Sequence, residues 1–127
     1  MIPKFRAWSK KFERMYDVTI IDFENGDVGL KDEYGGVAIG DIKQLILMQS
    51  TGMFDKNGVE IFDGDIVLTT RLIDYTYKDF KGVVKMLEGC WLIDTGTDAV
   101  YLWSEIEENE VVGNIYQNSE LLERLEG

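Results

Sequence analysis

The chain has 127 residues and 45% of them are hydrophobic, which is enough to build the core of one compact domain. Its net charge of −11 argues against affinity for a phosphate backbone, and the absence of histidine excludes His-based catalytic triads and histidine-ligated zinc sites. The single cysteine, Cys90, excludes an intramolecular disulfide and is typical of a reducing compartment.

The first predicted element is a hairpin. Residues 4–8 (KFRAW) and 14–20 (RMYDVTI) alternate polar and apolar side chains at period two, and the polar residues between them allow a turn. This is also the basic part of the protein, because residues 1–14 carry a net charge of +4 and the rest carries −15. The hairpin is either a solvated surface or a patch that pairs with acidic surface on another copy or on a partner. The candidate interaction patch consists of Lys4, Arg6, Trp8, Lys10 and Lys11.

A second hairpin is predicted between residues 20 and 30. Two apolar segments, 20–23 and 28–30, flank the dipeptide Asn25-Gly26, which suits the positive φ angles of a type I′ turn. In residues 32–40 three glycines weaken any regular element. We therefore expect a loop or an irregular strand there.

The segment TGMFDKNGVEIFDGDIV, residues 51–67, places four acidic side chains between apolar residues. Read as an EF-hand loop from Asp55, its fifth position is Val59 and its twelfth is Ile66, so the ligands that calcium needs are missing. The segment therefore predicts turns that separate short strands at 45–51, 59–62 and 66–70.

Asp63 and Asp65 flank Gly64, and two neighbouring carboxylates could share a cation. Aspartate beside glycine is, however, typical of a turn, because its carboxylate accepts nearby backbone N–H groups. We therefore predict a turn and no metal site here.

The later part of the chain continues the β pattern. Residues 71–82 are predicted as one long strand that leads to a bend at Gly82, and 83–94 as a hairpin with Cys90 as a small core residue. Further strands are expected at 99–103 and 111–116, before a short helix with Asn118 as N-cap. Core or subunit-interface positions are expected for the aromatic residues Trp8, Tyr75, Tyr77, Phe80, Trp91, Tyr101, Trp103 and Tyr116.

About ten short strands with frequent turns predict a mainly β fold, all-β or α+β, in which hairpins build a β-barrel followed by a short C-terminal helix. A parallel α/β architecture would need long crossover helices, which the pattern does not contain. We expect a single domain over residues 1–127, with an N-terminal β subdomain at about 1–50 and a barrel part at about 51–127.

No catalytic or cofactor motif is present in the sequence. It contains neither GxxxxGK[ST] nor GxGxxG after a strand, and acidic pairs without known geometry do not define a site. We expect no enzyme activity and no cofactor. The longest apolar run, Leu45–Met48, is far too short to span a membrane, and the amino terminus lacks a secretory signal, so we expect a cytoplasmic protein.

One long motif resembles a known family. The stretch LMQSTGMFDKNGVEIFDGDIV, residues 47–67, is similar to the signature of the YopX-like proteins of phages and prophages in low-GC Gram-positive bacteria. The segments KFRAW, KKFERMY, GVV (82–84) and VVGNIYQNSELL (111–122) extend the resemblance, while Ser50 and Ser119 depart from it. The resemblance implies a mainly β, barrel-containing and self-associating protein, and it carries over no catalytic residues.

We therefore expect a non-enzymatic phage or prophage accessory protein in the cytoplasm of a bacterial host cell. It would act by forming a homo-oligomer or by binding a host or phage protein. Two alternatives are nucleic-acid binding through the basic opening hairpin, which the net charge disfavours, and an acidic surface that mimics DNA and inhibits a host protein.

Overall fold

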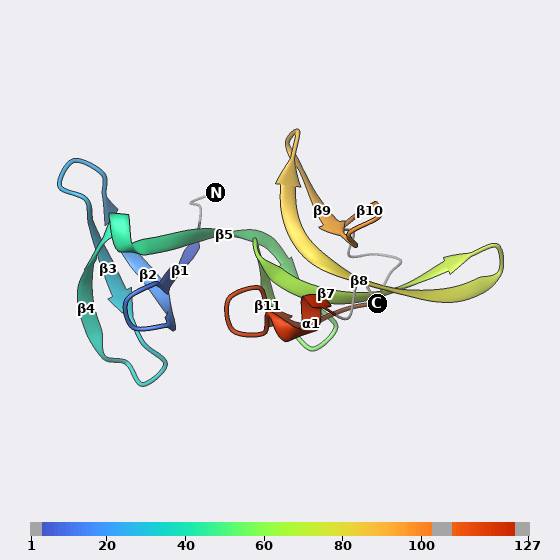
Figure 1. Ribbon diagram of the computed structural model, residues 1–127, viewed down its shortest axis with the longest axis horizontal. Helices are drawn as coiled ribbons and strands as arrows, with labels where there is room; N and C mark the ends of the chain where they lie inside the picture. The colour runs from blue at the N-terminus through green and yellow to red at the C-terminus, as the bar shows by residue number, and fades with distance from the viewer. Residues whose placement is uncertain (1–3, 103–107, 124–127) are drawn as a thin grey trace. The chain divides into compact units, whose positions relative to one another are not determined.

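A computed structural model describes residues 4–102 and 108–123. The chain divides into two compact units, Met1–Ser50 and Thr51–Gly127, and the strand β5 (Leu45–Phe54) crosses the boundary between them. Figure 1 shows that both units consist almost entirely of antiparallel hairpins. The prediction of a mainly β fold is therefore confirmed.

The first unit contains four strands, one 3-10 turn and the first part of β5. The sheet has the order β4-β3-β2-β1-β5-β6, in which β6 belongs to the second unit. Its elements are β1 (Phe5–Ser9), β2 (Arg14–Asp22), β3 (Asp27–Lys31), β4 (Val37–Asp41) and η1 (Ile42–Gln44).

The opening hairpin is confirmed. Ala7 on β1 lies opposite Tyr16 on β2, and the turn is tightened by the Phe12 N–H, which donates to Oγ of Ser9 at 3.1 Å. Side chains point alternately to the two faces of a strand, and one face of β1, β3 and β5 forms the core of this unit. Its buried apolar residues are Ala7, Val28, Leu30 and Leu45.

The second hairpin is also confirmed, but the predicted type I′ turn is wrong. Among the loop residues between β2 and β3 only Gly26 has a positive φ, +73°. Asn25 instead donates its side-chain Nδ2 to Oδ2 of Asp22 at 2.8 Å, and its backbone N–H donates to Oδ1 of Asp22 at 3.2 Å. These bonds from Asn25 lower the pKa of the Asp22 carboxyl. Asp22, which precedes the Asn25-Gly26 dipeptide, thus stabilises a loop longer than the two-residue type I′ turn.

Residues 32–40 are more regular than a loop or an irregular strand. Asp32 closes the loop before β4, because its Oδ1 accepts the N–H groups of Tyr34 at 2.9 Å and Gly36 at 2.8 Å. From Val37 onward the chain pairs with β3 without a register shift. The glycine at position 40 fits because a Cβ there would lie 2.9 Å from Cδ1 of Leu30.

The second unit contains a five-stranded sheet in the order β10-β9-β8-β7-β11. Its buried core is formed by Ile61, Val67, Val84, Ile93 and Leu102. The elements of this unit after β5 are β6 (Glu60–Phe62), β7 (Asp65–Ile73), β8 (Thr76–Leu87), β9 (Cys90–Asp94), β10 (Ala99–Tyr101), β11 (Glu108–Asn114) and the single helical turn α1 (Glu120–Glu123).

The predicted long strand over residues 71–82 is wrong, because the chain reverses direction at Asp74-Tyr75. Ile73 on β7 pairs with Thr76 on β8, and both loop residues have positive φ, 51° at Asp74 and 63° at Tyr75. Positive φ at both central residues is the geometry of a type I′ hairpin. Gly82 lies farther along β8, where a Cβ would collide with the carbonyl oxygen of Asp94.

The hairpin at residues 83–94 is confirmed, with Leu87 opposite Cys90 and positive φ at Glu88 and Gly89. Val111–Asn114 pairs with β7 through a bulge at Val111/Gly113, close to where Gly113 was expected to interrupt the last strand. The expected strand at 99–103 is described as β10, and position 103 lies outside the described residues.

The predicted barrel is not found within the described residues. β10 and β11 are the two edges of the five-stranded sheet, and closure would require these edges to pair. The predicted C-terminal helix is not confirmed, because the described tail holds only the single turn α1. Oδ1 of Asn118, the residue predicted as N-cap, accepts the Asn114 N–H at 3.1 Å instead, while its carbonyl accepts the Leu121 N–H at 2.9 Å. No helix in the described part of the chain is long and apolar enough to span a membrane.

Candidate interaction sites

The acidic residues of segment 51–67 bind backbone donors. Asp55 is buried, with 7% of its surface exposed, and its Oδ1 accepts the N–H groups of Asn57 and Val59, both at 2.8 Å. Its Oδ2 accepts the N–H of Val111 on β11 at 2.9 Å. A single carboxylate therefore both shapes the β5–β6 loop and fixes that loop to a strand from the far end of the chain.

The charge of Asp55 is stabilised in this position. Burial raises the pKa of its carboxyl, but the N–H groups of Val111, Val59 and Asn57 outweigh burial, and the net pKa lies below the usual 3.8. Next to it, the Lys56 N–H donates to the carbonyl of Asn109 at 2.9 Å. The loop thus caps the outer edge of β11 with two hydrogen bonds, one to the Asp55 carboxylate and one from the Lys56 backbone N–H.

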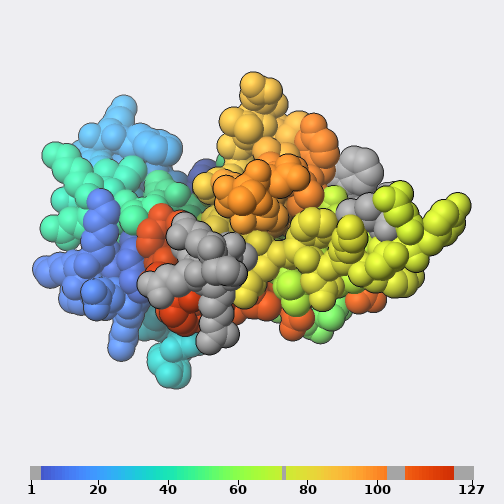
Figure 2. Space-filling model, turned by 45° about the vertical axis from the view of Figure 1, so that its right-hand side comes forward, coloured from blue at the N-terminus to red at the C-terminus, as the bar shows by residue number. Residues whose placement is uncertain are grey.

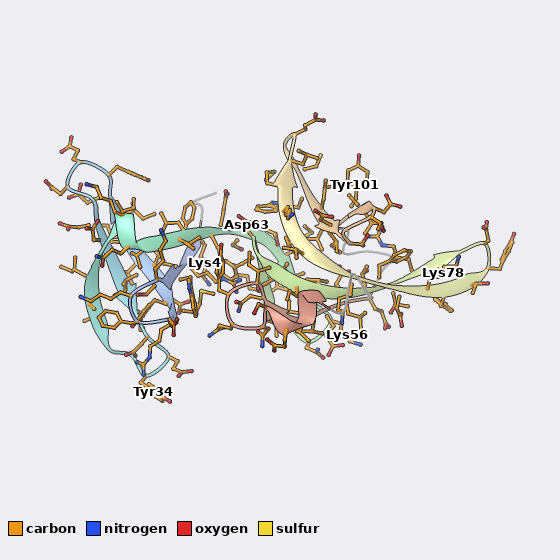
Figure 3. All side chains as sticks on the ribbon, viewed as in Figure 1. Lys4, Tyr34, Lys56, Asp63, Lys78 and Tyr101 are labelled. Carbon is orange, nitrogen blue, oxygen red and sulfur yellow. The ribbon has the colours of Figure 1, made fainter. Side chains whose placement is uncertain are left out.

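Asp65 stabilises the next turn, between β6 and β7. It is 1% exposed, and its Oδ2 accepts the N–H of Phe62 at 2.8 Å. Between them Gly64 takes a φ of +86°, which L side chains rarely adopt. Asp63, at the same turn, is partly exposed and is labelled in Figure 3. Within residues 4–102 and 108–123 no group of three or more acidic or cysteine side chains is placed to hold a metal ion.

The structure separates the residues of the basic patch along β1. Lys4 precedes the strand, while Lys10 and Lys11 follow it in the turn, and all three are exposed. Arg6 and Trp8 share the opposite face from Ala7 and are partly buried. The patch is therefore two small basic sites at the ends of a strand.

The local environment weakens the positive charge on β1 itself. Arg6 lies directly opposite Asp17, an acidic neighbour, in the β1–β2 register. At the turn, the Lys11 ammonium lies 5.4 Å from the centre of the Phe12 ring, which is 64% exposed.

The end of the β7–β8 hairpin, residues 71–78, forms a two-stranded ribbon that Figure 1 shows projecting from the sheet. β11 pairs with β7 only as far as Thr70, and β9 pairs with β8 only from Val83, so no other described strand pairs with the ribbon. Its exposed apolar side chains are Leu72 at 56%, Tyr75 at 100% and Tyr77 at 75%. We call this the β7–β8 ribbon.

The ribbon also carries two cations. Arg71 and Lys78 lie directly opposite each other, and Arg71 Nη2 donates to the carbonyl of Tyr101 on β10. Figure 3 labels both Lys78 and Tyr101. Arg71 and Lys78 thus place two cationic side chains on one face of the ribbon, which also carries Asp74 at its tip.

An open pocket of about 510 Å³ lies between β8, β9 and the turn before β10. Figure 2 shows residues of this region, yellow to orange, on the face turned toward the viewer. The lining includes Met86 and Leu92, and at its rim the Lys85 ammonium lies 2.9 Å from Oδ2 of Asp94. The Gly96 N–H and then this Lys85 contact lower the pKa of Asp94.

The core position predicted for Cys90 is wrong, and the aromatic residues predicted for the core or a subunit interface are only in part buried. Cys90 was expected in the core, but it is exposed, because it directly follows the β8–β9 turn. Of the aromatic residues, Trp91 packs against the core of the second unit, whereas Tyr101 is 53% exposed. Trp103 lies outside the described residues. The ribbon was missed because Asp74-Tyr75 contains neither glycine nor proline.

Comparison with known proteins identifies close relatives in fold. The family model described as YopX protein matches residues 4–123. The crystal structure of protein EF1440 from Enterococcus faecalis is 27% identical and has a TM-score of 0.57, covering 96% of this chain and 99% of that one. The X-ray structure of YopX from Bacillus subtilis is 27% identical with a TM-score of 0.63, covering 94% and 95%. No curated protein matches the chain.

Proposed function

The chain belongs to the YopX family, and from this premise we propose that it acts without catalysis, by binding a protein partner through the β7–β8 ribbon. The partner is a host or phage protein, and the protein serves as a phage or prophage accessory factor in the host cytoplasm. A second contact, between copies of the chain, is part of the same proposal.

The observation that carries the proposal is the conformation of Tyr75. It is fully exposed, and its φ of 63° lies in the left-handed region. For a residue with a side chain that region costs about 1–2 kcal/mol. Glycine would avoid this strain, and an exposed ring contributes nothing to the core. A strained aromatic residue at the tip of a projecting hairpin is typical of a contact residue.

The rest of the ribbon supports a protein partner. Burial of a large apolar side chain contributes about 1.5–3 kcal/mol, and aromatic residues are enriched among the residues that dominate interface energy. Leu72 and Tyr77 lie opposite each other and widen the apolar contact. The exposed Lys78 favours a partner with an acidic group at this position.

A photo-reactive amino acid at position 75 tests the proposal in host cells. We expect a discrete covalent adduct with one protein. The matched control places the same group at Glu24, which lies on an exposed loop of the first unit. Adducts that are identical at both positions, or missing at position 75, would overturn the proposal. A second variant, Tyr77→Ser, should reduce the yield of the adduct from position 75.

A second candidate function is nucleic-acid binding at the β1–β2 turn. It is favoured by the exposed Phe12 ring beside Lys11, a combination that can stack on a base and contact a phosphate. Fluorescence anisotropy with a labelled single strand at low salt tests it. Binding that weakens steeply with added salt and disappears in Phe12→Ser would support this function, and no binding at low salt would exclude it.

A further inference from the structure

Two of the edge strands, β11 and β4, differ in how their unpaired sides are covered. On β11 the edge is covered, since Lys56 and Asp55 contact Asn109 and Val111 through the loop described above. On β4 no described strand or loop pairs with the outer side. Figure 1 shows β4 at the outer margin of the first unit. An uncovered edge strand is a template for pairing with another chain.

The face of β4 is apolar as well. Val37 and Ile39 share one face and are 78% and 79% exposed. In the register of β2, β3 and β4, Ile20 lies opposite Gly29 and Gly29 opposite Ile39, so a row across three strands ends at this edge. Ile20 is 67% exposed.

The direction of the backbone groups on β4 follows from two hydrogen bonds. The Asp32 N–H donates to the carbonyl of Gly36, and the Ile42 N–H donates to the carbonyl of Gly26, both at 2.9 Å. In an antiparallel pair the residues that exchange hydrogen bonds alternate along each strand. Even-numbered residues of β4 therefore face β3. The N–H and C=O groups of Val37, Ile39 and Asp41 point outward.

β4 lacks the usual features that prevent edge pairing. Its five residues contain no lysine, no proline and no bulge, and its only charge is Asp41 at the end. Both ends are held in place, by Asp32 in the preceding loop and by Asp41, whose Oδ1 accepts the Lys43 N–H at 2.9 Å. The strand is thus preorganised to accept a partner strand.

We propose that β4 pairs antiparallel with β4 of a second copy around a two-fold axis at Ala38. Val37 then exchanges hydrogen bonds with Ile39 of the second copy, and Ile39 with Val37. The acidic ends are compatible, because Asp41 lies opposite Gly35 of the second copy and not opposite another acid. A register shifted by two residues would set Val37 against Asp41. This pairing rests on the self-association part of the proposed function.

A cross-linking experiment tests the register. In a Cys90→Ser background, Ala38→Cys places two thiols in a non-hydrogen-bonded pair, where Cα atoms are about 4.5 Å apart and a disulfide can form. The matched control is Ile39→Cys, whose counterpart in the second copy lies diagonally at roughly 7–8 Å. We expect mild oxidation to give a covalent dimer of Ala38→Cys at least about tenfold faster than of Ile39→Cys. Equal or reversed rates would overturn the inference.

A solution-mass experiment tests the dimer without a cross-link. Sedimentation should give twice the 14.6 kDa of the chain for the native sequence. Ile39→Pro removes an outward N–H and leaves the β3–β4 bonds intact, so it should weaken the dimer by at least about tenfold with little change in Tm. Ile20→Lys, on the same face but away from the edge, should still dimerise.

The outcomes separate the two proposals. A native chain that stays monomeric at millimolar concentration, or an Ile39→Pro dimer as tight as the native one, overturns β4 pairing and leaves an adduct at Tyr75 unaffected. Loss of the Tyr75 adduct with an intact β4 dimer overturns partner binding through the β7–β8 ribbon alone.

Discussion

Val111 donates its backbone N–H to Oδ2 of Asp55, 56 residues earlier in the chain, at 2.9 Å. This one bond joins the most recognisable loop of the sequence to the last strand of the fold. It shows that an acidic residue in a turn can be a structural element, because its carboxylate accepts a backbone N–H that a neighbouring strand would otherwise bind.

Asp55→Ala should destabilise the second unit strongly. The change leaves the N–H groups of Asn57, Val59 and Val111 without this acceptor, and a lost charged hydrogen bond with a desolvated donor costs about 1–3 kcal/mol. We expect a loss of about 2–4 kcal/mol in the free energy of unfolding from urea titration. Glu24→Ala on an exposed loop is the control, and an equal effect of both substitutions would refute the role of Asp55.

Stability should decrease in acid. Asp55 and Asp94 have folded-state pKa values below the usual 3.8, so the unfolded chain binds protons first as the pH falls. Their contribution is complete above pH 3.8 and is lost as the pH falls through the folded pKa values. Urea midpoints measured from neutral to acidic pH check this. The native chain should lose more stability than Asp55→Ala over that range, and parallel curves would rule it out.

Gly82→Ala and Gly96→Ala should distinguish a glycine needed for close packing from a glycine needed for a positive φ angle. A Cβ at position 82 would collide with the Asp94 carbonyl, and such overpacking costs about 1–3 kcal/mol. Gly96 has a φ of +96° with nothing within 4 Å, so alanine there meets only backbone strain of about 1–2 kcal/mol and no collision. Thermal unfolding should rank Gly82→Ala as the more damaging change. The reverse order would mean that β8 can move away from β9.

Replacing Asp74-Tyr75 by Asn-Gly should stabilise the ribbon but impair its function. Asn-Gly is the preferred sequence for the type I′ geometry observed here, and relief of strain should raise the free energy of unfolding by about 0.5–1 kcal/mol. The same variant should lose the partner adduct, measured with the photo-reactive group at position 77. Retained adduct formation together with higher stability would show that Tyr75 has no contact role.

Local patterns predicted the hairpins whose turns are polar or carry a glycine. The β1–β2 and β8–β9 hairpins follow from alternation and short polar or Glu-Gly turns, and the resemblance to the YopX family is confirmed. The β7–β8 reversal was missed because Tyr75 adopts a conformation that its residue type disfavours. The regularity of β4 was underestimated, because glycine weakens a strand in general, whereas Gly40 here allows close packing on Leu30.

The sites depended on information that is distant in sequence. The partner of Asp55 is 56 positions away, and no local pattern identifies Val111 as its donor. The exposure of Cys90 depends on the exact end of β8, which periodicity locates only to within a few residues. The predicted basic patch stays a prediction, and its members are spread along β1, with Lys4 before the strand, Arg6 and Trp8 on it, and Lys10 and Lys11 after it.

The link between Asp55 and Val111 also constrains the order of folding during synthesis. All strands that pair within the first unit are complete by residue 50, so they can assemble while the ribosome is still translating the rest. The second unit must wait, because Asp55 in the β5–β6 loop lacks the N–H donor of Val111 until β11 has left the exit tunnel. A nascent chain that stalls before position 111 should therefore carry a folded beginning and a protease-sensitive remainder.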